Sequence, residues 1–262
     1  MKRFLALALA SLAVASPVSG DLSAPVSLRW KAPLRVLNYA TELTAPPPSD
    51  FRLDMEALAK GKLDPAGPIA RLPHQLNVRG SWTTQVESSV GGTIAVRLLG
   101  LKRQTCLKAD LSATGEVLTF WIESREKNLL QMLFELPSQP VRVGDTWPLH
   151  VNLVTAGQRF TVKDSARLDE ARLVSLQPGP GGDTVATIDY VVVEWVKGVV
   201  GERETSMSLG FVGRGEFLIG KGAWKHFSCW MASQSGEPGI QTPEVVLVSL
   251  MPTDLSATNS TR

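Results

Sequence analysis

Alternation of apolar with polar residues is the feature that most constrains what this chain can fold into. It is strictest in Phe51–Ala57, and in Leu37–Leu43 larger side chains alternate with polar or small neighbours. A period of two residues is typical of a half-buried strand, because successive side chains on a strand point to opposite faces. The other candidate strands are 75–85, 92–99, 106–111, 117–122, 149–154, 160–163, 168–176, 184–196, 206–211, 215–219, 224–232 and 245–250. The sequence therefore predicts a mainly β fold.

The segment around Phe51–Ala57 also allows a helical interpretation. A helix from Asp50 to Lys60 could be capped by Ser49 and could end before Gly61. Strict alternation would distribute the charged residues around such a helix, so the pattern favours a strand.

One segment has the periodicity of an α-helix. In residues 126–136, apolar side chains recur at spacings of three and four, and Pro137 ends the pattern. The spacing predicts one central helix. Segments 26–124 and 147–250 are alike in outline, as two similar halves joined by the helix and linker of residues 125–146 would be. An antiparallel sheet and a two-layer β-sandwich both satisfy this pattern.

Residues 1–20 have the composition of a secretory signal peptide. Two basic residues precede an apolar run over Phe4–Ala15, and small residues follow as far as Gly20. Cleavage after Ala15 or after Gly20 fits, and we favour Gly20. The chain is then an exported protein, periplasmic or secreted, with one β-rich domain over 21–250 and a flexible tail over 251–262. No cysteine lies near the cleavage point, so a lipoprotein is not expected.

The charge distribution narrows the possible partners. The full chain has 27 Lys and Arg against 25 Asp and Glu, and loss of Lys2 and Arg3 would leave the mature chain with no net charge. The remaining basic residues are scattered, whereas nucleic-acid binders concentrate cations on one face. No later stretch approaches the ~18 consecutive apolar residues of a membrane helix. We therefore expect neither nucleic-acid binding nor a transmembrane helix in the mature chain.

The linker after the predicted helix contains a compact motif. Pro140–Trp147 reads Pro-Val-x-Val-Gly-Asp-x-Trp, and Gly213-Arg-Gly215-Glu-Phe217 follows later. Both resemble elements in a loose group of exported bacterial β-rich proteins of uncharacterised function, in which a helix interrupts a long antiparallel sheet. The resemblance implies an envelope or secreted β-rich protein, and it transfers no catalytic residue.

Within that motif, Gly144 and Asp145 are suited to a tight turn. Glycine accepts a positive φ angle, and an aspartate side chain bonds neighbouring amides. Val141, Val143 and Trp147 would then pin the turn to the core. A catalytic role for Asp145 is the alternative, although no second carboxylate, histidine or nucleophile accompanies it locally.

The familiar sequence signatures of catalysis and of metal binding are missing. The three histidines are widely separated and lack zinc-ligand spacing, and no Gly-x-Ser-x-Gly elbow is present. We therefore predict no cofactor and no metal. The leading hypothesis is a non-catalytic envelope or secreted protein that binds a partner protein or an amphiphilic ligand. The alternative is a hydrolase whose site is assembled from distant residues.

Two cysteines and one aromatic strand are the remaining candidates. Cys106 and Cys229 could form a disulfide in an oxidising compartment, or could be separate buried thiols. On one face of the strand around 224–230, Trp224, His226 and Trp230 could line a groove for a lipid tail, glycan or peptide. Burial beneath the helix or a second layer is the more common fate of such side chains.

Overall fold

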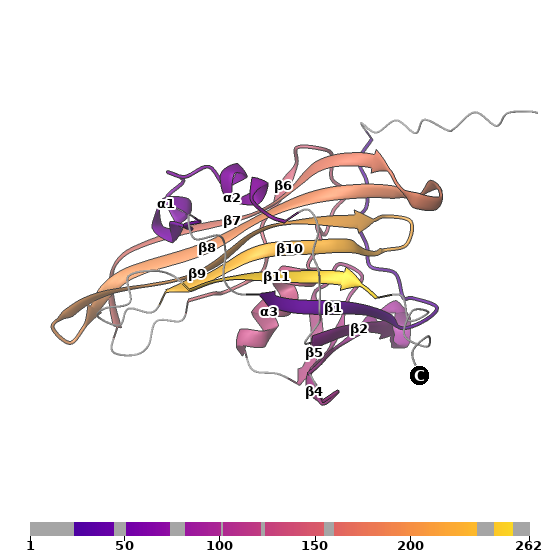
Figure 1. The fold of residues 1–262 in the computed structure, drawn as a ribbon, viewed down its shortest axis with the longest axis horizontal. Helices are drawn as coiled ribbons and strands as arrows, with labels where there is room; N and C mark the ends of the chain where they lie inside the picture. Colours follow the sequence, from indigo (N-terminus) through magenta and orange to yellow (C-terminus); the bar gives the residue numbers. More distant parts are fainter. Residues whose placement is uncertain are drawn as a thin grey trace, which may run out of the picture.

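The computed structural model describes residues 24–44, 51–73, 82–100, 102–121, 124–154, 160–234 and 244–253. Within them, eleven antiparallel strands form a single sheet in the order β5-β4-β3-β2-β1-β11-β10-β9-β8-β7-β6 (Figure 1). The predicted mainly β fold is confirmed, with one sheet in place of a two-layer sandwich. The predicted signal peptide lies outside the described residues.

The strands fall into a short-stranded and a long-stranded meander. The first has β1 Leu37–Thr44, β2 Trp82–Ser88, β3 Ile94–Leu99, β4 Thr105–Leu111 and β5 Val117–Trp121. The second has β6 Thr146–Trp147, β7 Phe160–Pro178, β8 Thr184–Val200, β9 Arg203–Leu218, β10 Ala223–Gln234 and β11 Glu244–Pro252. The first strand pairs with the last, so β1 and β11 join the meanders at the middle of the sheet.

Helices pack on both faces of this sheet. Helix α3, Ser124–Phe134, packs with Leu28, Trp30 and Leu149 on one face, and the short helices α1, Met55–Ala59, and α2, Ala66–Ala70, pack on the other. Strand β8 serves both layers, because Tyr190 and Val192 face the α3 side while Val191, Val193 and Trp195 face α1 and α2. Within the described residues, no helix combines the length and the apolar character needed to cross a membrane.

The prediction of a strand over Phe51–Ala57 is wrong. Phe51, Leu53 and Met55 are buried while their neighbours are exposed, as the alternation indicates, but the segment packs on the sheet instead of joining it. Helix α1 begins at Met55 because the Asp54 carboxylate caps it, accepting a hydrogen bond from the Ala57 amide at 2.9 Å. The capping hydrogen bond therefore starts a helix here, although apolar and charged residues alternate as in a strand.

Other boundaries also differ from the prediction. The central helix begins and ends two residues earlier than 126–136. Residues 149–154 form no strand, and the predicted pairs 160–163 with 168–176 and 206–211 with 215–219 are continuous as β7 and β9. Strand β11 continues to Pro252, into the predicted tail, whose residues beyond 253 lie outside the described residues.

The turn between β4 and β5 fixes the end of α3. Gly115 has a φ of +79°, and a Cβ placed there would lie 1.9 Å from the Phe134 carbonyl oxygen. The neighbouring Thr114 carbonyl accepts a hydrogen bond from the Leu136 amide at 2.8 Å. This turn therefore holds the C-terminal end of α3 against the sheet, and only glycine allows so close an approach.

Candidate functional site

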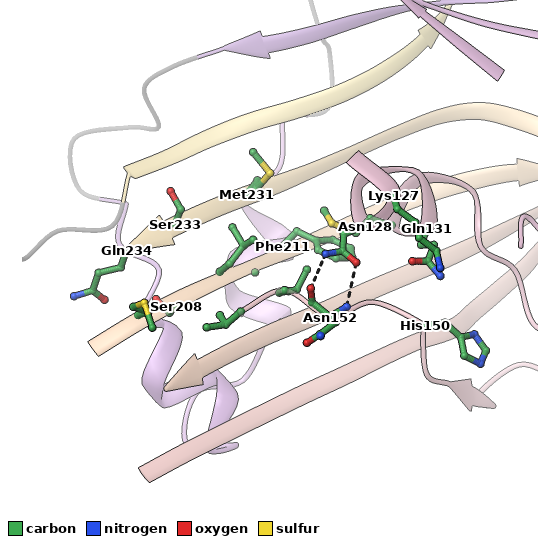
Figure 2. Close-up of a pocket in the computed structure, with 16 residues that line it drawn as sticks. Lys127, Asn128, Gln131, His150, Asn152, Ser208, Phe211, Met231, Ser233 and Gln234 are labelled. Carbon is green, nitrogen blue, oxygen red and sulfur yellow. Dashed lines mark hydrogen bonds between the residues drawn. The ribbon is translucent and has the colours of Figure 1, made fainter. Parts of the chain in front are cut away.

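A groove of about 900 Å³ lies on the α3 side of the sheet. Helix α3 and the segment 150–154 form its sides, and β9 and β10 form its floor (Figure 2). We call it the α3 groove, and its lining residues are Lys127, Asn128, Gln131, Met132, His150, Asn152, Leu153, Val154, Met207, Ser208, Leu209, Gly210, Phe211, Met231, Ser233 and Gln234.

Strand register creates the apolar floor. Met207, Leu209 and Phe211 alternate along β9 and so point to one face. Met231 of β10 is paired with Phe211, and Ser233 with Leu209, so both point to that same face. Phe211 is fully buried, whereas Met207, Leu209 and Met231 are half-buried. The floor thus presents apolar surface that the described residues leave partly open.

Two asparagines join the sides of the groove. The Asn128 amide donates to the Asn152 carbonyl oxygen at 2.6 Å, and the Asn152 backbone amide donates to Asn128 Oδ1 at 3.1 Å (Figure 2). Further along, the Glu194 carboxylate on β8 accepts hydrogen bonds from the Leu153 and Val154 amides, both at 3.0 Å. These bonds hold the irregular segment 150–154 in place where a strand was predicted.

A second polar contact joins the C-terminal end of α3 to the same segment. Glu135 accepts a hydrogen bond from the His150 backbone amide at 2.9 Å, and its other oxygen contacts His150 Nδ1. The Glu135 side chain is 8% exposed and that of His150 is 84% exposed. The hydrogen bond to this carboxylate raises the pKa of His150 above its ordinary value of 6.5.

Stability should depend on this pair in a defined direction. Because the pKa of His150 is higher in the folded state, its charged form stabilises the fold fully below pH 6.5, and this contribution is lost as pH rises through the folded pKa. We expect His150→Ala to lower the melting temperature more in buffer well below pH 6.5 than in alkaline buffer. Thermal melts of both proteins across the range measure this. An equal decrease at every pH would contradict the proposed charge on the imidazole.

A second cavity lies beside the groove. It has a volume of about 560 Å³, shares Lys127, Gln131 and His150 with the groove, and is also lined by Glu116 and Glu135. Gln131 is 4% exposed as a whole residue, and it lines both the groove and the second cavity. An amide that lines a cavity can donate and accept hydrogen bonds, so Gln131 is a natural contact for a bound polar group.

The prediction of a groove lined by Trp224, His226 and Trp230 is wrong. A β-bulge between Trp224 and His226 shifts the register, so that Trp224 joins the α3-side core and Trp230 joins the opposite core. Both are buried, at 1% and 4% exposure, and each indole donates to a backbone carbonyl. His226 is partly buried, and desolvation lowers its pKa.

The two cysteines are not bonded to each other. Cys106 on β4 and Cys229 on β10 are separated by five strand spacings, roughly 24 Å, which no disulfide spans. Cys229 is fully buried, and burial raises the pKa of its thiol. The structure therefore has two separate thiols, of which Cys229 is buried and Cys106 is partly exposed.

The contacts of Gly144 and Asp145 are those of a structural turn. Gly144 has a φ of +97°, and the Asp145 carboxylate accepts a hydrogen bond from the Arg142 amide at 2.8 Å. Trp147 is buried in the α3-side core, while Val143 is 48% exposed and does not pin the turn as expected. Gly144, Asp145 and Trp147 do not line the α3 groove.

Sequence reasoning missed the α3 groove itself. Its residues come from four separate segments, and only the alternation within 206–211 and the methionines at 207 and 231 indicated apolar surface there. Among the described residues, no group of three or more His, Cys, Asp or Glu could hold a metal ion. Comparison with protein-family models, with curated proteins and with solved structures finds no match to this chain.

Proposed function

We propose that this protein is a non-catalytic binding protein that holds a hydrophobic or amphiphilic ligand in the α3 groove. One observation carries the proposal: a groove of about 900 Å³ has a half-buried apolar floor between polar sides. Sites for small ligands generally have volumes of roughly 300–1,000 Å³, with mostly apolar linings and few polar groups. The groove matches that description in size and in its apolar floor.

The residue types of the floor support an adaptable apolar ligand. Three of the six methionines of the chain, Met132, Met207 and Met231, line the groove. Methionine is unbranched and polarisable, so it packs against apolar groups of varied shape. A floor of this kind suits a flexible chain better than a rigid polar substrate.

Export remains part of the proposal. The N-terminal sequence has the pattern of a signal peptide, which supports action in the periplasm or outside the cell. A ligand with poor solubility in water would need a protein carrier or receptor in such a compartment. An envelope partner protein could deliver or accept it.

The pair of Glu135 and His150 favours a hydrolase as the second candidate. A histidine oriented by a buried carboxylate is one part of a nucleophilic site. Within the described residues, however, His150 forms hydrogen bonds with Glu135 and with no serine or cysteine. Turnover of a chromogenic fatty ester that His150→Ala abolishes would favour the hydrolase over the binding protein.

The binding proposal makes a direct prediction for Ser233→Trp. Ser233 is exposed and faces the groove from β10, so an indole there would occupy the site without disturbing the core. We expect the affinity for the uncharged dye Nile red to decrease roughly tenfold, since loss of ~1.4 kcal/mol of contact is enough. Fluorescence titration measures the affinity.

The matched control is Thr161→Trp. Thr161 is likewise an exposed strand residue, on β7, and it does not line the groove. It should bind Nile red as the wild type does, and both variants should melt near the wild-type temperature. Equal binding by Ser233→Trp and Thr161→Trp would place the dye elsewhere and would contradict the proposal.

A further inference from the structure

The α3 groove has two chemically different ends. Lys127, Gln131 and His150 gather at the end beside α3, whereas Ser208, Ser233 and Gln234 lie at the other (Figure 2). Phe211 and Met231 lie between them. We call the first group the donor end, because each of its side chains carries N–H groups. The apolar floor thus leads from a donor-rich end to a neutral one.

The lining of the α3 groove itself is positively charged. Lys127 is the only Lys, Arg, Asp or Glu among the described residues that line it, and the raised pKa of His150 favours a second positive charge there. The nearby carboxylates of Glu116 and Glu135 line the second cavity, where Glu135 accepts hydrogen bonds from His150. A negative ligand group at the donor end would therefore meet donors and no carboxylate of the groove lining.

Two hydrogen-bonding groups at this end are available to a ligand. Gln131 lines both the groove and the second cavity, so its amide can contact a ligand there. His150 contacts Glu135 through Nδ1, so Nε2 lies on the far side of a ring that is 84% exposed. An anion placed between them would accept a hydrogen bond from the Gln131 amide and a charge-assisted one from His150 Nε2.

From this arrangement we infer that the ligand is a single-chain amphiphile with an anionic head group, a carboxylate or a phosphate. Its head lies at the donor end, against Lys127, Gln131 and His150. Its chain lies on the floor of Met207, Leu209, Phe211 and Met231. The inference rests on the proposed function, since it assigns the head group of the ligand that the groove would hold.

A competition series isolates the head group from the chain. Dodecanoate, dodecyl phosphate, dodecyl maltoside and dodecyltrimethylammonium share one chain, and each would displace Nile red from the protein below its micellar concentration. We expect the two anions to compete about tenfold better than the cation, because they accept charge-assisted hydrogen bonds at the donor end, whereas trimethylammonium accepts none and has the same charge as Lys127. Added salt should reduce this advantage. The stronger of the two anions identifies the head group as carboxylate or phosphate.

Variants at the donor end complete the test. Lys127→Gln and Gln131→Leu should each remove most of the preference for anions, which is a ratio of competition within one variant and so does not depend on that variant's affinity for Nile red. Lys62→Gln replaces an exposed lysine beside α1, which packs on the opposite face of the sheet, and should change neither property.

The outcomes separate the two proposals. Nile red binding with equal competition by all four head groups, or with preference for the cation, overturns the anionic ligand while the binding function stands. Failure of the wild-type protein to bind Nile red or any of the four amphiphiles overturns both.

Discussion

Replacement of Trp224 by alanine is expected to lower the free energy of unfolding by about 3–5 kcal/mol, the usual cost of removing a large buried aromatic side chain. Trp224 is 1% exposed, and its ring packs edge-on against Trp30 and Phe217 at centroid distances of 6.1 and 5.2 Å. Its indole donates to the Leu133 carbonyl oxygen at 2.7 Å. The truncation would leave both a cavity and an unpaired acceptor.

Urea unfolding measures this effect, and a loss of that size is a large part of a typical total of ~5–15 kcal/mol. Lys225→Ala is the control, because Lys225 is the exposed neighbour on the same strand. A loss below about 1 kcal/mol for Trp224→Ala would mean that the indole is not a core residue.

The second large effect is expected at Gly115. In Gly115→Ala, the new methyl group would meet the Phe134 carbonyl oxygen at 1.9 Å, on a backbone with a φ of +79°. Left-handed strain costs about 1–2 kcal/mol and overpacking about 1–3 kcal/mol, so we expect a loss of about 2–5 kcal/mol. Displacement of the end of α3 should also weaken Nile red binding, since α3 forms one side of the groove.

Gly91→Ala separates strain from collision. Gly91 has a nearly equal φ of +73°, but no atom lies within 4 Å of the added Cβ. It should lose only the strain, about 1–2 kcal/mol, and should keep its affinity for the dye. Urea unfolding and Nile red titration of both variants provide the comparison. Equal losses in stability would show that the contact with Phe134 is unimportant.

The periodicity of apolar residues predicted the elements in which one pattern continues without interruption. It failed where a bulge interrupts the alternation of side chains. The alternation in Leu37–Leu43 predicted β1, and the spacing of leucines predicted α3 to within two residues. The bulge after Trp224 adds one residue to the strand and reverses the faces beyond it. A strict period of two therefore placed Trp224 and Trp230 on one face when they lie on opposite faces.

Side-chain contacts over long separations explain the other errors. Residues 149–154 have the composition of a strand, but Asn128, Glu135 and Glu194 bind their backbone amides in place of a neighbouring strand. The α3 groove likewise depends on β9 and β10 lying beside α3, which no local pattern encodes. The groove could be recognised only once Phe211 was seen to pair with Met231. This pairing is a property of the assembled sheet.

The pairing of β1 with β11 has a consequence for the time course of folding. These strands are the first and the last in the described part of the chain, so the ribosome completes one long after the other, and closing so large a loop is entropically slow. Until then, each meander has an unpaired edge strand, and open edges invite association with other chains. The two meanders are therefore most exposed to association before they join, and the pairing of β1 with β11 should be the last part of the sheet to form.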